Sequence, residues 1–181
     1  MKKDHTLVAL LRGINVGGRN KLPMAELRSI ASECGCGSPA TYLQSGNLFL
    51  STSKAPATVQ TLLADAIKKR CGLEVPVIVR TPDAIQYLID SNPYAKEAAE
   101  DPTKVLVTFL PEPASKILQE WDHRHFAPER AHVSGSEIYL SLPFGMSKTK
   151  LAPALSRIDS VTLGTTRNWR TVVALAERAG R

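Results

Sequence analysis

The stretch Thr41-Tyr-Leu-Gln-Ser-Gly-Asn-Leu-Phe-Leu50 decides the fold class of this chain. Short apolar runs lie on either side of Ser45-Gly46-Asn47, and a glycine beside an asparagine is typical of the tight turn in a β-hairpin. A hairpin joins antiparallel strands, so the sheet that contains this one cannot be purely parallel.

The segments on either side of this hairpin predict one helix and one strand each. The apolar stripes of the helices are Met24, Leu27, Ile30 and Ala31 before the hairpin, and Val59, Leu62, Leu63, Ala66 and Ile67 after it. Gly35 and Gly72 end these helices, and Pro56 begins the second. The outermost runs, 7–11 and 75–79, predict strands. The order strand, helix, strand, strand, helix, strand is that of the ferredoxin-like fold.

The same order recurs in the second half of the chain. The predicted strands are 105–110, 131–133, 138–142 and 161–163, with a hairpin turn at Gly135, and the predicted helices contain Ile117, Leu118 and Trp121, then Leu151, Leu155 and Ile158. An extra helix follows each half, one with Ile85, Leu88 and Ile89, the other with Trp169 on its apolar face and Thr166 as its N-cap. We therefore predict an α+β protein of two ferredoxin-like (βαββαβ) halves, residues 1–96 and 103–181, joined by a charged linker at 96–102.

Composition narrows the class of protein. The chain has 181 residues, of which 43% are hydrophobic, and its longest apolar runs are far shorter than the roughly 18 residues that a membrane-spanning helix needs. Three cysteines form no paired framework, and Cys34-Gly-Cys36 lacks a second pair at metal-ligand spacing. We expect a cytoplasmic protein with free thiols, without a metal, a cofactor or a membrane partner.

The net charge of +6 is unevenly distributed. Residues 1–80 hold 11 Lys and Arg against 5 Asp and Glu, residues 81–143 hold 5 against 10, and residues 144–181 hold 7 against 2. The basic residues therefore concentrate toward both ends of the sequence, with an acidic stretch between them, although scattered solvated charge would give a similar balance.

A glycine-rich loop between the first strand and the first helix is the first candidate site. Its members are Arg12, Gly13, Asn15, Gly17, Gly18, Arg19 and Lys21. Glycines at such a position let backbone N–H groups converge on an anion, and arginine offers forked donors to phosphate or carboxylate. The alternative is a surface crossover with glycine at turn positions. A nucleotide-hydrolysing phosphate loop is excluded, because Arg19 and Asn20 stand where the required lysine and hydroxyl should follow Gly18.

A second candidate cluster consists of Arg167, Asn168 and Arg170 at the predicted start of the last helix. A helix N-terminus carries partial positive charge, so this cluster could hold an anion, and it would share one cleft with the first if the two faced each other. The alternative is a helix cap with surface arginines.

Two other functions remain as alternatives to anion binding. An acylphosphatase-like hydrolase shares the ferredoxin-like fold, and Arg12 or Arg19 would bind the substrate while Asn47 positions water. A nucleic-acid-binding protein would use the same basic residues along the phosphates, but this interface usually needs aromatic side chains on the central strands, and the first strand has none.

Several segments resemble those of one bacterial family, the domain of unknown function DUF1697. The opening 8–27, the hairpin 41–49 and the closing Thr165-Thr-Arg-Asn-Trp-Arg-Thr-Val172 are similar to its signatures. Ser147-Lys-Thr-Lys-Leu151 is similar to its Ser-Lys-Leu stretch, with two additional residues inside. The resemblance implies two ferredoxin-like halves and no particular activity. The hypothesis is thus an anion-binding module for a phosphorylated or otherwise anionic small molecule, with enzymatic activity left open.

Overall fold

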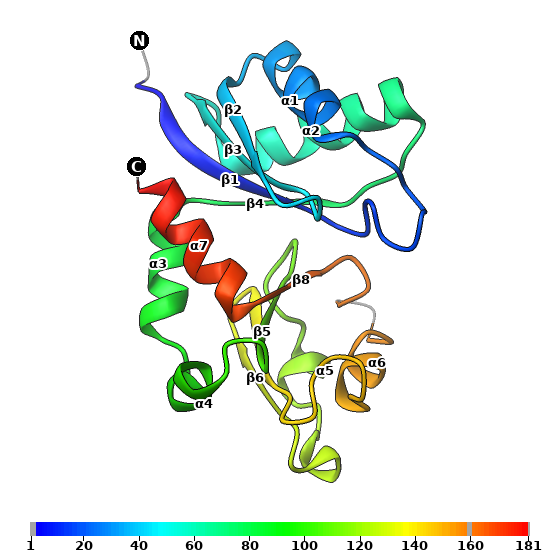
Figure 1. Ribbon diagram of the computed structural model, residues 1–181, viewed down its shortest axis with the longest axis vertical. Helices are drawn as coiled ribbons and strands as arrows, with labels where there is room; N and C mark the ends of the chain where they lie inside the picture. Colours follow the sequence, from blue (N-terminus) through cyan, green and yellow to red (C-terminus); the bar gives the residue numbers. More distant parts are fainter. Residues whose placement is uncertain (1–2, 159–160, 181) are drawn as a thin grey trace. The chain divides into compact units, whose positions relative to one another are not determined.

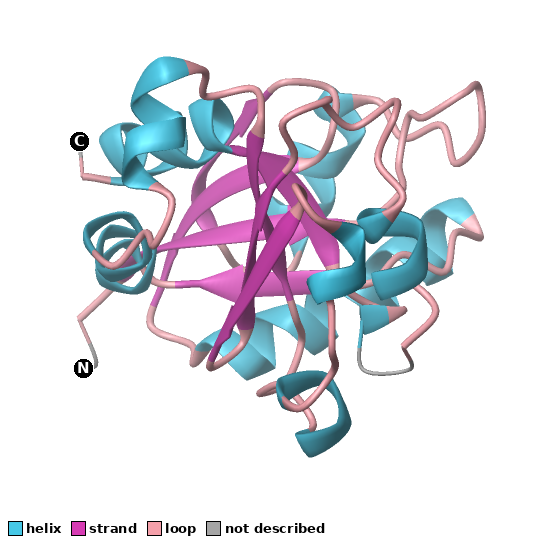
Figure 2. Cartoon of the chain, turned by 90° about the horizontal axis from the view of Figure 1, so that it is seen from below, coloured by secondary structure: helices cyan, strands magenta, loops and turns pink. Residues whose placement is uncertain are grey.

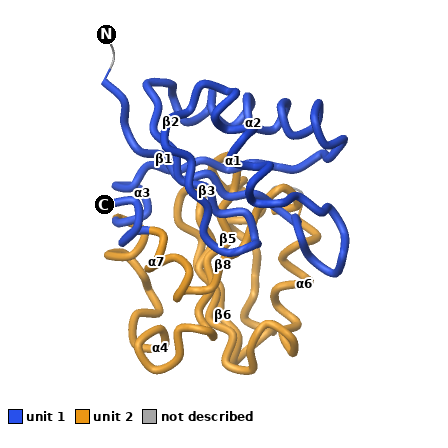
Figure 3. Tube along the Cα trace, turned by 45° about the horizontal axis from the view of Figure 1, so that its top comes forward, with its two compact units in different colours: residues 1–86, 176–181 blue, residues 87–175 orange. Residues whose placement is uncertain are grey.

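The computed structural model describes residues 3–158 and 161–180 and divides the chain into two compact units (Figure 3). One unit comprises the residues up to Gln86 together with those from Ala176 onward, and the other comprises Tyr87–Leu175. Each unit contains one four-stranded antiparallel sheet with helices, which confirms the predicted α+β class with two ferredoxin-like halves.

The first unit contains the elements expected around the first hairpin (Figure 1). They are β1 (His5–Leu11), α1 (Met24–Glu33), β2 (Gly37–Tyr42), β3 (Asn47–Thr52), α2 (Pro56–Cys71) and β4 (Val77–Arg80), followed by α3 (Pro82–Asp90). The sheet order is β2-β3-β1-β4, and β1 pairs antiparallel with both neighbours, His5 facing Thr52 and Val8 facing Arg80. The central position of β1 explains why its sequence is a continuous apolar run.

Alternate side chains of β1 contribute to the hydrophobic core of this unit. Leu7, Ala9 and Leu11 pack with the buried faces of α1 and α2, which cover one face of the sheet in Figure 1. The intervening Val8 and Leu10 are also fully buried. Gly72 ends α2 in the left-handed conformation (φ 68°), as expected for a glycine after a helix.

The second unit repeats the sheet. Its elements are α4 (Ala95–Glu100), β5 (Val105–Phe109), α5 (Lys116–Gln119), a 3₁₀ turn (Arg124–Phe126), β6 (Arg130–Ser134), β7 (Glu137–Ser141), α6 (Leu151–Leu155) and β8 (Thr165–Asn168). Helix α7 (Trp169–Ala179) begins in this unit, and its last residues, from Ala176 onward, belong to the first. The strand order is β6-β7-β5-β8, which matches the order of the first sheet. In Figure 2 the strands of both units are coloured magenta and the helices cyan. The extra helices predicted after the two sheets are α3 and α7.

Two elements of the second half were predicted at the wrong place. The closing strand is 165–168 and not 161–163, and Thr166 lies on this strand beside Thr108, with 2.8 Å between the two hydroxyl oxygens. The N-cap of α7 is consequently Asn168, whose side-chain oxygen accepts from the backbone N–H of Thr171 at 2.9 Å. The polar strand was missed because its burial comes from pairing with β5 and is not visible in its sequence.

The segment interpreted as a linker is partly helical. Residues 95–100 form α4, because alanine, lysine and glutamate are strong helix formers, and the helix ends shortly before Pro102. In addition, α5 ends at Gln119, so Trp121 lies just beyond the helix that was predicted to contain it.

No helix in the described ranges 3–158 and 161–180 is long and apolar enough to cross a membrane.

Candidate functional site

The side chain of Asn15 organises the loop that follows β1. Its amide nitrogen donates to the carbonyl oxygens of Leu22 and Gln44, both at 2.9 Å, and its oxygen accepts from the backbone N–H of Leu22 at 2.9 Å. Asn15 has a φ of 56°, which asparagine tolerates better than most residues. One side chain therefore joins the start of the loop to its end and to the β2–β3 turn.

The glycines form the tip of this loop. Val16 and Arg19 make an antiparallel bridge, and Gly17 and Gly18 between them have φ values of 56° and 77°, as in a type I′ turn. Asn20 adds a side-chain bond to the carbonyl oxygen of Gly13 at 3.0 Å. The glycines are thus accounted for by turn geometry, and the tip, including the 65% exposed Val16, projects into solvent.

The β2–β3 turn lies beside this loop. The backbone N–H of Leu11 donates to the carbonyl oxygen of Gly46 at 2.8 Å, and a Cβ on Gly46 would lie 2.7 Å from Ile14 Cδ1. The N–H of Arg12 donates to the carbonyl oxygen of Pro76 at 3.0 Å. Three segments that are distant in sequence therefore meet at one end of the first sheet.

The basic side chains of the loop have no counter-charge in the described part of the chain. Arg12 is partly exposed, Arg19 and Lys21 are exposed, and none of the three forms an ion pair or a side-chain hydrogen bond there. The whole segment from His5 to Ala25 contains no Asp or Glu. By contrast, Arg70 in the same unit pairs with both Glu26 and Glu33. The loop is therefore a locally positive surface.

Asn47 lies next to this end of the sheet but inside it. The residue is fully buried, and its amide nitrogen donates to the carbonyl oxygen of Tyr42 at 2.8 Å and to the hydroxyl of Ser45 at 3.2 Å. These bonds hold the β2–β3 turn. The geometry thus favours a structural role over the positioning of water.

The second candidate cluster does not form one exposed surface. Arg167 on β8 is 7% exposed and donates to the Thr165 hydroxyl at 2.7 Å and to the Thr166 carbonyl oxygen at 2.9 Å. Burial lowers its pKa to about 10, since a guanidinium removed from water loses hydration. Arg170 is exposed, and Asn168 caps α7. Of these three residues, only Arg170 presents its side chain fully to solvent.

One carboxylate of the second unit, that of Glu129, is buried and was not predicted from the sequence. Glu129 is 5% exposed and accepts from the Thr149 hydroxyl at 2.9 Å and from the backbone N–H groups of Lys150 and Leu151, the latter at 2.7 Å. It thereby anchors the start of α6. An acidic residue directly before a strand gives no sequence signal for this role, because its partners lie about twenty residues later.

The described residues form neither a metal-ligand cluster nor a disulfide. They contain no group of three or more His, Cys, Asp or Glu side chains that could hold a metal ion. Cys34, Cys36 and Cys71 are free thiols, and burial raises the pKa of both Cys34 and Cys36.

Comparisons with known proteins agree with this fold. The solved structure of the conserved bacterial protein SP0830 from Streptococcus pneumoniae is similar, with a TM-score of 0.78 and 20% sequence identity over 97% of this chain and 99% of that one. A search of curated proteins finds no significant match. The profile of a family described as "Protein of unknown function (DUF1697)" matches residues 5–139. Because this match spans most of the chain, the protein belongs to the DUF1697 family.

Proposed function

We propose that this protein is an anion-binding module whose loop 12–21 contacts a phosphorylated small molecule. The observation that carries the proposal is the fixed positive loop: Asn15 holds its two ends together, while Arg12, Arg19 and Lys21 have no counter-charge among the described residues. A preorganised loop loses little conformational freedom on binding, which favours affinity.

Several smaller observations support the same proposal. Arginine is suited to phosphate because its forked donors match two oxygens at once. The exposed tip glycines leave room for a ligand to approach the backbone, since a Cβ on Gly17 or Gly18 would meet nothing within 4 Å. The buried, hydrogen-bonded Asn47 does not favour the hydrolase alternative.

The test measures thermal stability with inorganic phosphate, pyrophosphate and adenosine monophosphate at millimolar concentration. A ligand present at a hundred times its Kd stabilises the folded state by about 2.7 kcal/mol, which is a measurable rise in Tm. Arg19→Ala should abolish this rise. Arg157→Ala, which removes an exposed arginine of the second unit with the same change in net charge, should leave it intact.

Other outcomes would overturn the proposal. If none of the three anions raises the Tm, or if both variants respond like the wild type, the loop does not bind phosphate. If a DNA or RNA duplex binds instead, with an affinity that falls steeply as salt rises, the nucleic-acid alternative is correct.

A further inference from the structure

Two apolar side chains are exposed at the end of the first sheet where loop 12–21 lies. Val16 at the tip of that loop is 65% exposed, and Leu43 in the β2–β3 turn is 51% exposed. The two turns are joined, because Asn15 beside Val16 donates to the carbonyl oxygen of Gln44 beside Leu43, at 2.9 Å. In Figure 1 the loop extends beyond the end of β1. We call Val16 and Leu43 together the apolar tip.

The backbone of Leu43 adopts a conformation that leucine normally avoids. Its φ is 60°, in the left-handed region, where the Cβ comes too close to the following carbonyl oxygen. Asparagine or glycine would adopt this conformation more easily, and a polar side chain would suit the exposure better. Neither the backbone nor the exposure of this position therefore favours leucine, and strained residues of this kind cluster at functional sites.

The charge around the apolar tip is positive. The three basic residues of loop 12–21 have no counter-charge among the described residues. Residues 5–25 and 34–64, which contain both turns, include no Asp or Glu. The acidic residues that flank these segments are held in ion pairs, Glu26 with Arg70 and Glu74 with Lys68. The surface therefore attracts anions and exposes apolar groups at the same place.

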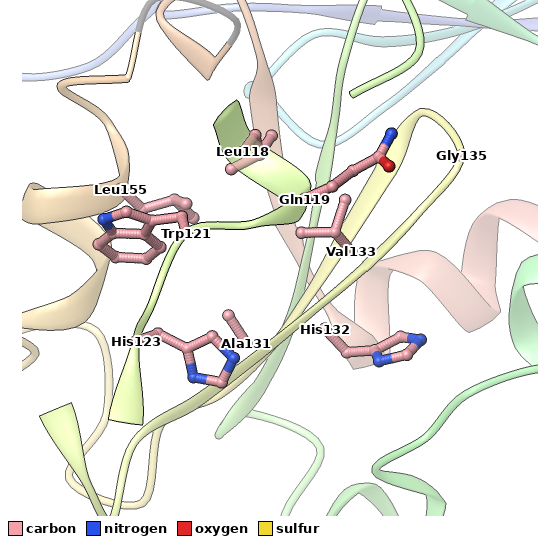
Figure 4. A pocket seen from close by; sticks show the side chains of 9 residues that line it. All are labelled: Leu118, Gln119, Trp121, His123, Ala131, His132, Val133, Gly135 and Leu155. Atoms are coloured by element: carbon pink, nitrogen blue, oxygen red, sulfur yellow. The ribbon is translucent and has the colours of Figure 1, made fainter. Parts of the chain in front are cut away.

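A pocket in the second unit lacks this combination. It lies beside β6, has a volume of about 430 Å³, and its lining includes Trp121, Leu118 and Leu155 (Figure 4). None of its lining residues is a lysine or an arginine. The loop, by contrast, is cationic and projects into solvent, since a Cβ on Gly17 or Gly18 would meet nothing within 4 Å. A projecting surface of this kind can reach the headgroups of a bilayer.

We propose that the apolar tip and the basic residues of loop 12–21 bind the surface of a bilayer that contains anionic phospholipid. The inference rests on the phosphate binding proposed above and assigns that phosphate to a lipid headgroup. The three basic side chains would pair with headgroup phosphates, while Val16 and Leu43 enter the boundary between headgroups and acyl chains. The expectation of no membrane partner rested on short apolar runs, which exclude a spanning helix but not the insertion of two side chains.

An anionic bilayer accounts for both properties of this surface. A free phosphate would engage the basic residues but would leave the apolar tip in water. A bilayer presents phosphates at its surface and hydrocarbon beneath them. The loop has the matching order, because Val16 lies at its tip whereas Arg12 and Lys21 lie nearer its base, where Asn15 bonds to Leu22. Charge and apolar groups can therefore be satisfied in one orientation.

The test is cosedimentation of the protein with vesicles, either of phosphatidylcholine alone or of an equal mixture with phosphatidylglycerol. The protein should bind the mixed vesicles more tightly, and salt should weaken this binding. Arg19→Ala should weaken it by about fivefold, the contribution of one cation near an anionic surface. Arg157→Ala, with the same change in net charge, should not. Hydrogen exchange on the mixed vesicles should slow in residues 15–19 and 43–45.

Variants of the apolar tip test insertion separately from charge. Val16→Thr keeps the branched shape of the side chain and Leu43→Asn keeps the net charge, and each should weaken binding to the mixed vesicles at least about threefold. Leu43→Asn should at the same time raise the Tm, because asparagine tolerates a φ of 60°. A purely structural role of Leu43 would not combine these two effects. Ile117→Thr, at a 74% exposed position of α5, should leave binding unchanged.

The proposal fails if both kinds of vesicle bind the protein equally or not at all, if both tip variants bind like the wild type, or if the slowed amides lie elsewhere. If phosphate still raises the Tm in such a case, the phosphate site stands and only its assignment to lipid is wrong. If neither phosphate nor vesicles bind, both proposals fail. Binding to polyglutamate in place of vesicles, weakened by the tip variants, would assign the surface to an acidic protein and would equally overturn the lipid assignment.

Discussion

Asn15 and Leu22 are joined by two reciprocal hydrogen bonds. The backbone N–H of Leu22 donates to Asn15 Oδ1, and Asn15 Nδ2 donates to the carbonyl oxygen of Leu22, both at 2.9 Å. These bonds add to the backbone pairing of Val16 with Arg19 at the tip, so they fix the path of the chain between β1 and α1.

Replacing Asn15 should therefore destabilise the first unit. Asn15→Ala removes three hydrogen bonds and places alanine at φ 56°, and we expect a loss of about 3 kcal/mol in the free energy of unfolding. Asn15→Asp keeps the acceptor for the Leu22 N–H and should lose less. Urea denaturation measures both, and equal stability of Asn15→Ala and the wild type would contradict the role assigned to this side chain.

Gly46→Ala should be more harmful than alanine at another left-handed glycine. A Cβ at Gly46 would lie 2.7 Å from Ile14 Cδ1 and 2.8 Å from Leu11 Cβ, and the residue has a φ of 81°. Overpacking together with strain should cost about 2 to 4 kcal/mol.

Gly72→Ala is the matched control for this comparison. Gly72 has a φ of 68°, but a Cβ there would meet nothing within 4 Å, so only the conformational cost of about 1 to 2 kcal/mol applies. Thermal denaturation ranks the two variants. If they were equally stable, the close packing around Gly46 would not matter.

The buried carboxylate of Glu129 should be required for the segment that leads into α6. Glu129→Gln keeps the size of the side chain but weakens its charge-assisted bonds, with an expected loss of about 1 to 2 kcal/mol. Glu129→Ala also leaves the N–H groups of Lys150 and Leu151 without this acceptor, and it should cost more. Faster amide exchange at Leu151 in both variants would localise the effect, and unchanged exchange would argue against it.

Because of Tyr139, the free energy of unfolding should depend on pH in the alkaline range. Its hydroxyl donates to the carbonyl oxygen of Leu88 at 2.9 Å, and burial raises its pKa above the ordinary value of about 10. Below that ordinary value the phenol is protonated in both states, and its stabilisation is fully present. Above it the unfolded chain ionises first, so the free energy of unfolding decreases as pH rises toward the folded-state pKa.

Tyr139→Phe is the variant that checks this dependence. It should lower stability near neutral pH by about 1 kcal/mol, because one hydrogen bond is lost. It should also reduce the decrease in stability between about pH 9 and 11. The part due to Tyr94, Cys34 and Cys36 should remain, because burial raises the pKa of these groups too. Parallel pH profiles of variant and wild type would be inconsistent with the shift.

The elements that the sequence predicted correctly are those whose residues carry their own signal. Leu7 to Leu11 is apolar because β1 lies at the centre of its sheet, and Gly72 ends α2 because it adopts a left-handed conformation. The β2–β3 turn was located from Ser45 to Asn47 for a similarly local reason. Such signals need no knowledge of distant residues.

The errors arose where distant contacts decide the structure. Strand β8 is polar in sequence, and its pairing with β5 buries Arg167. Residues 161–163 are more apolar and were therefore predicted as the strand. The next residue, Gly164, packs closely against β5, since a Cβ on it would lie 3.0 Å from the carbonyl oxygen of Phe109. In the candidate site, too, local features were predicted and distant contacts were not. The sequence placed Arg12, Arg19 and Lys21 in one loop, whereas the bonds of Asn15 to Leu22 and Gln44 were not predicted.

The sequence by itself determined the class of fold, the order of its elements in both halves and the basic character of the loop after β1. Hydrophobic periodicity, turn residues and charge are local properties, so they can be identified from the sequence alone. Only the tertiary structure decided which polar residues are buried and which strand closes the second sheet. Those features depend on partners far along the chain, as when the pairing of β8 with β5 buries Arg167.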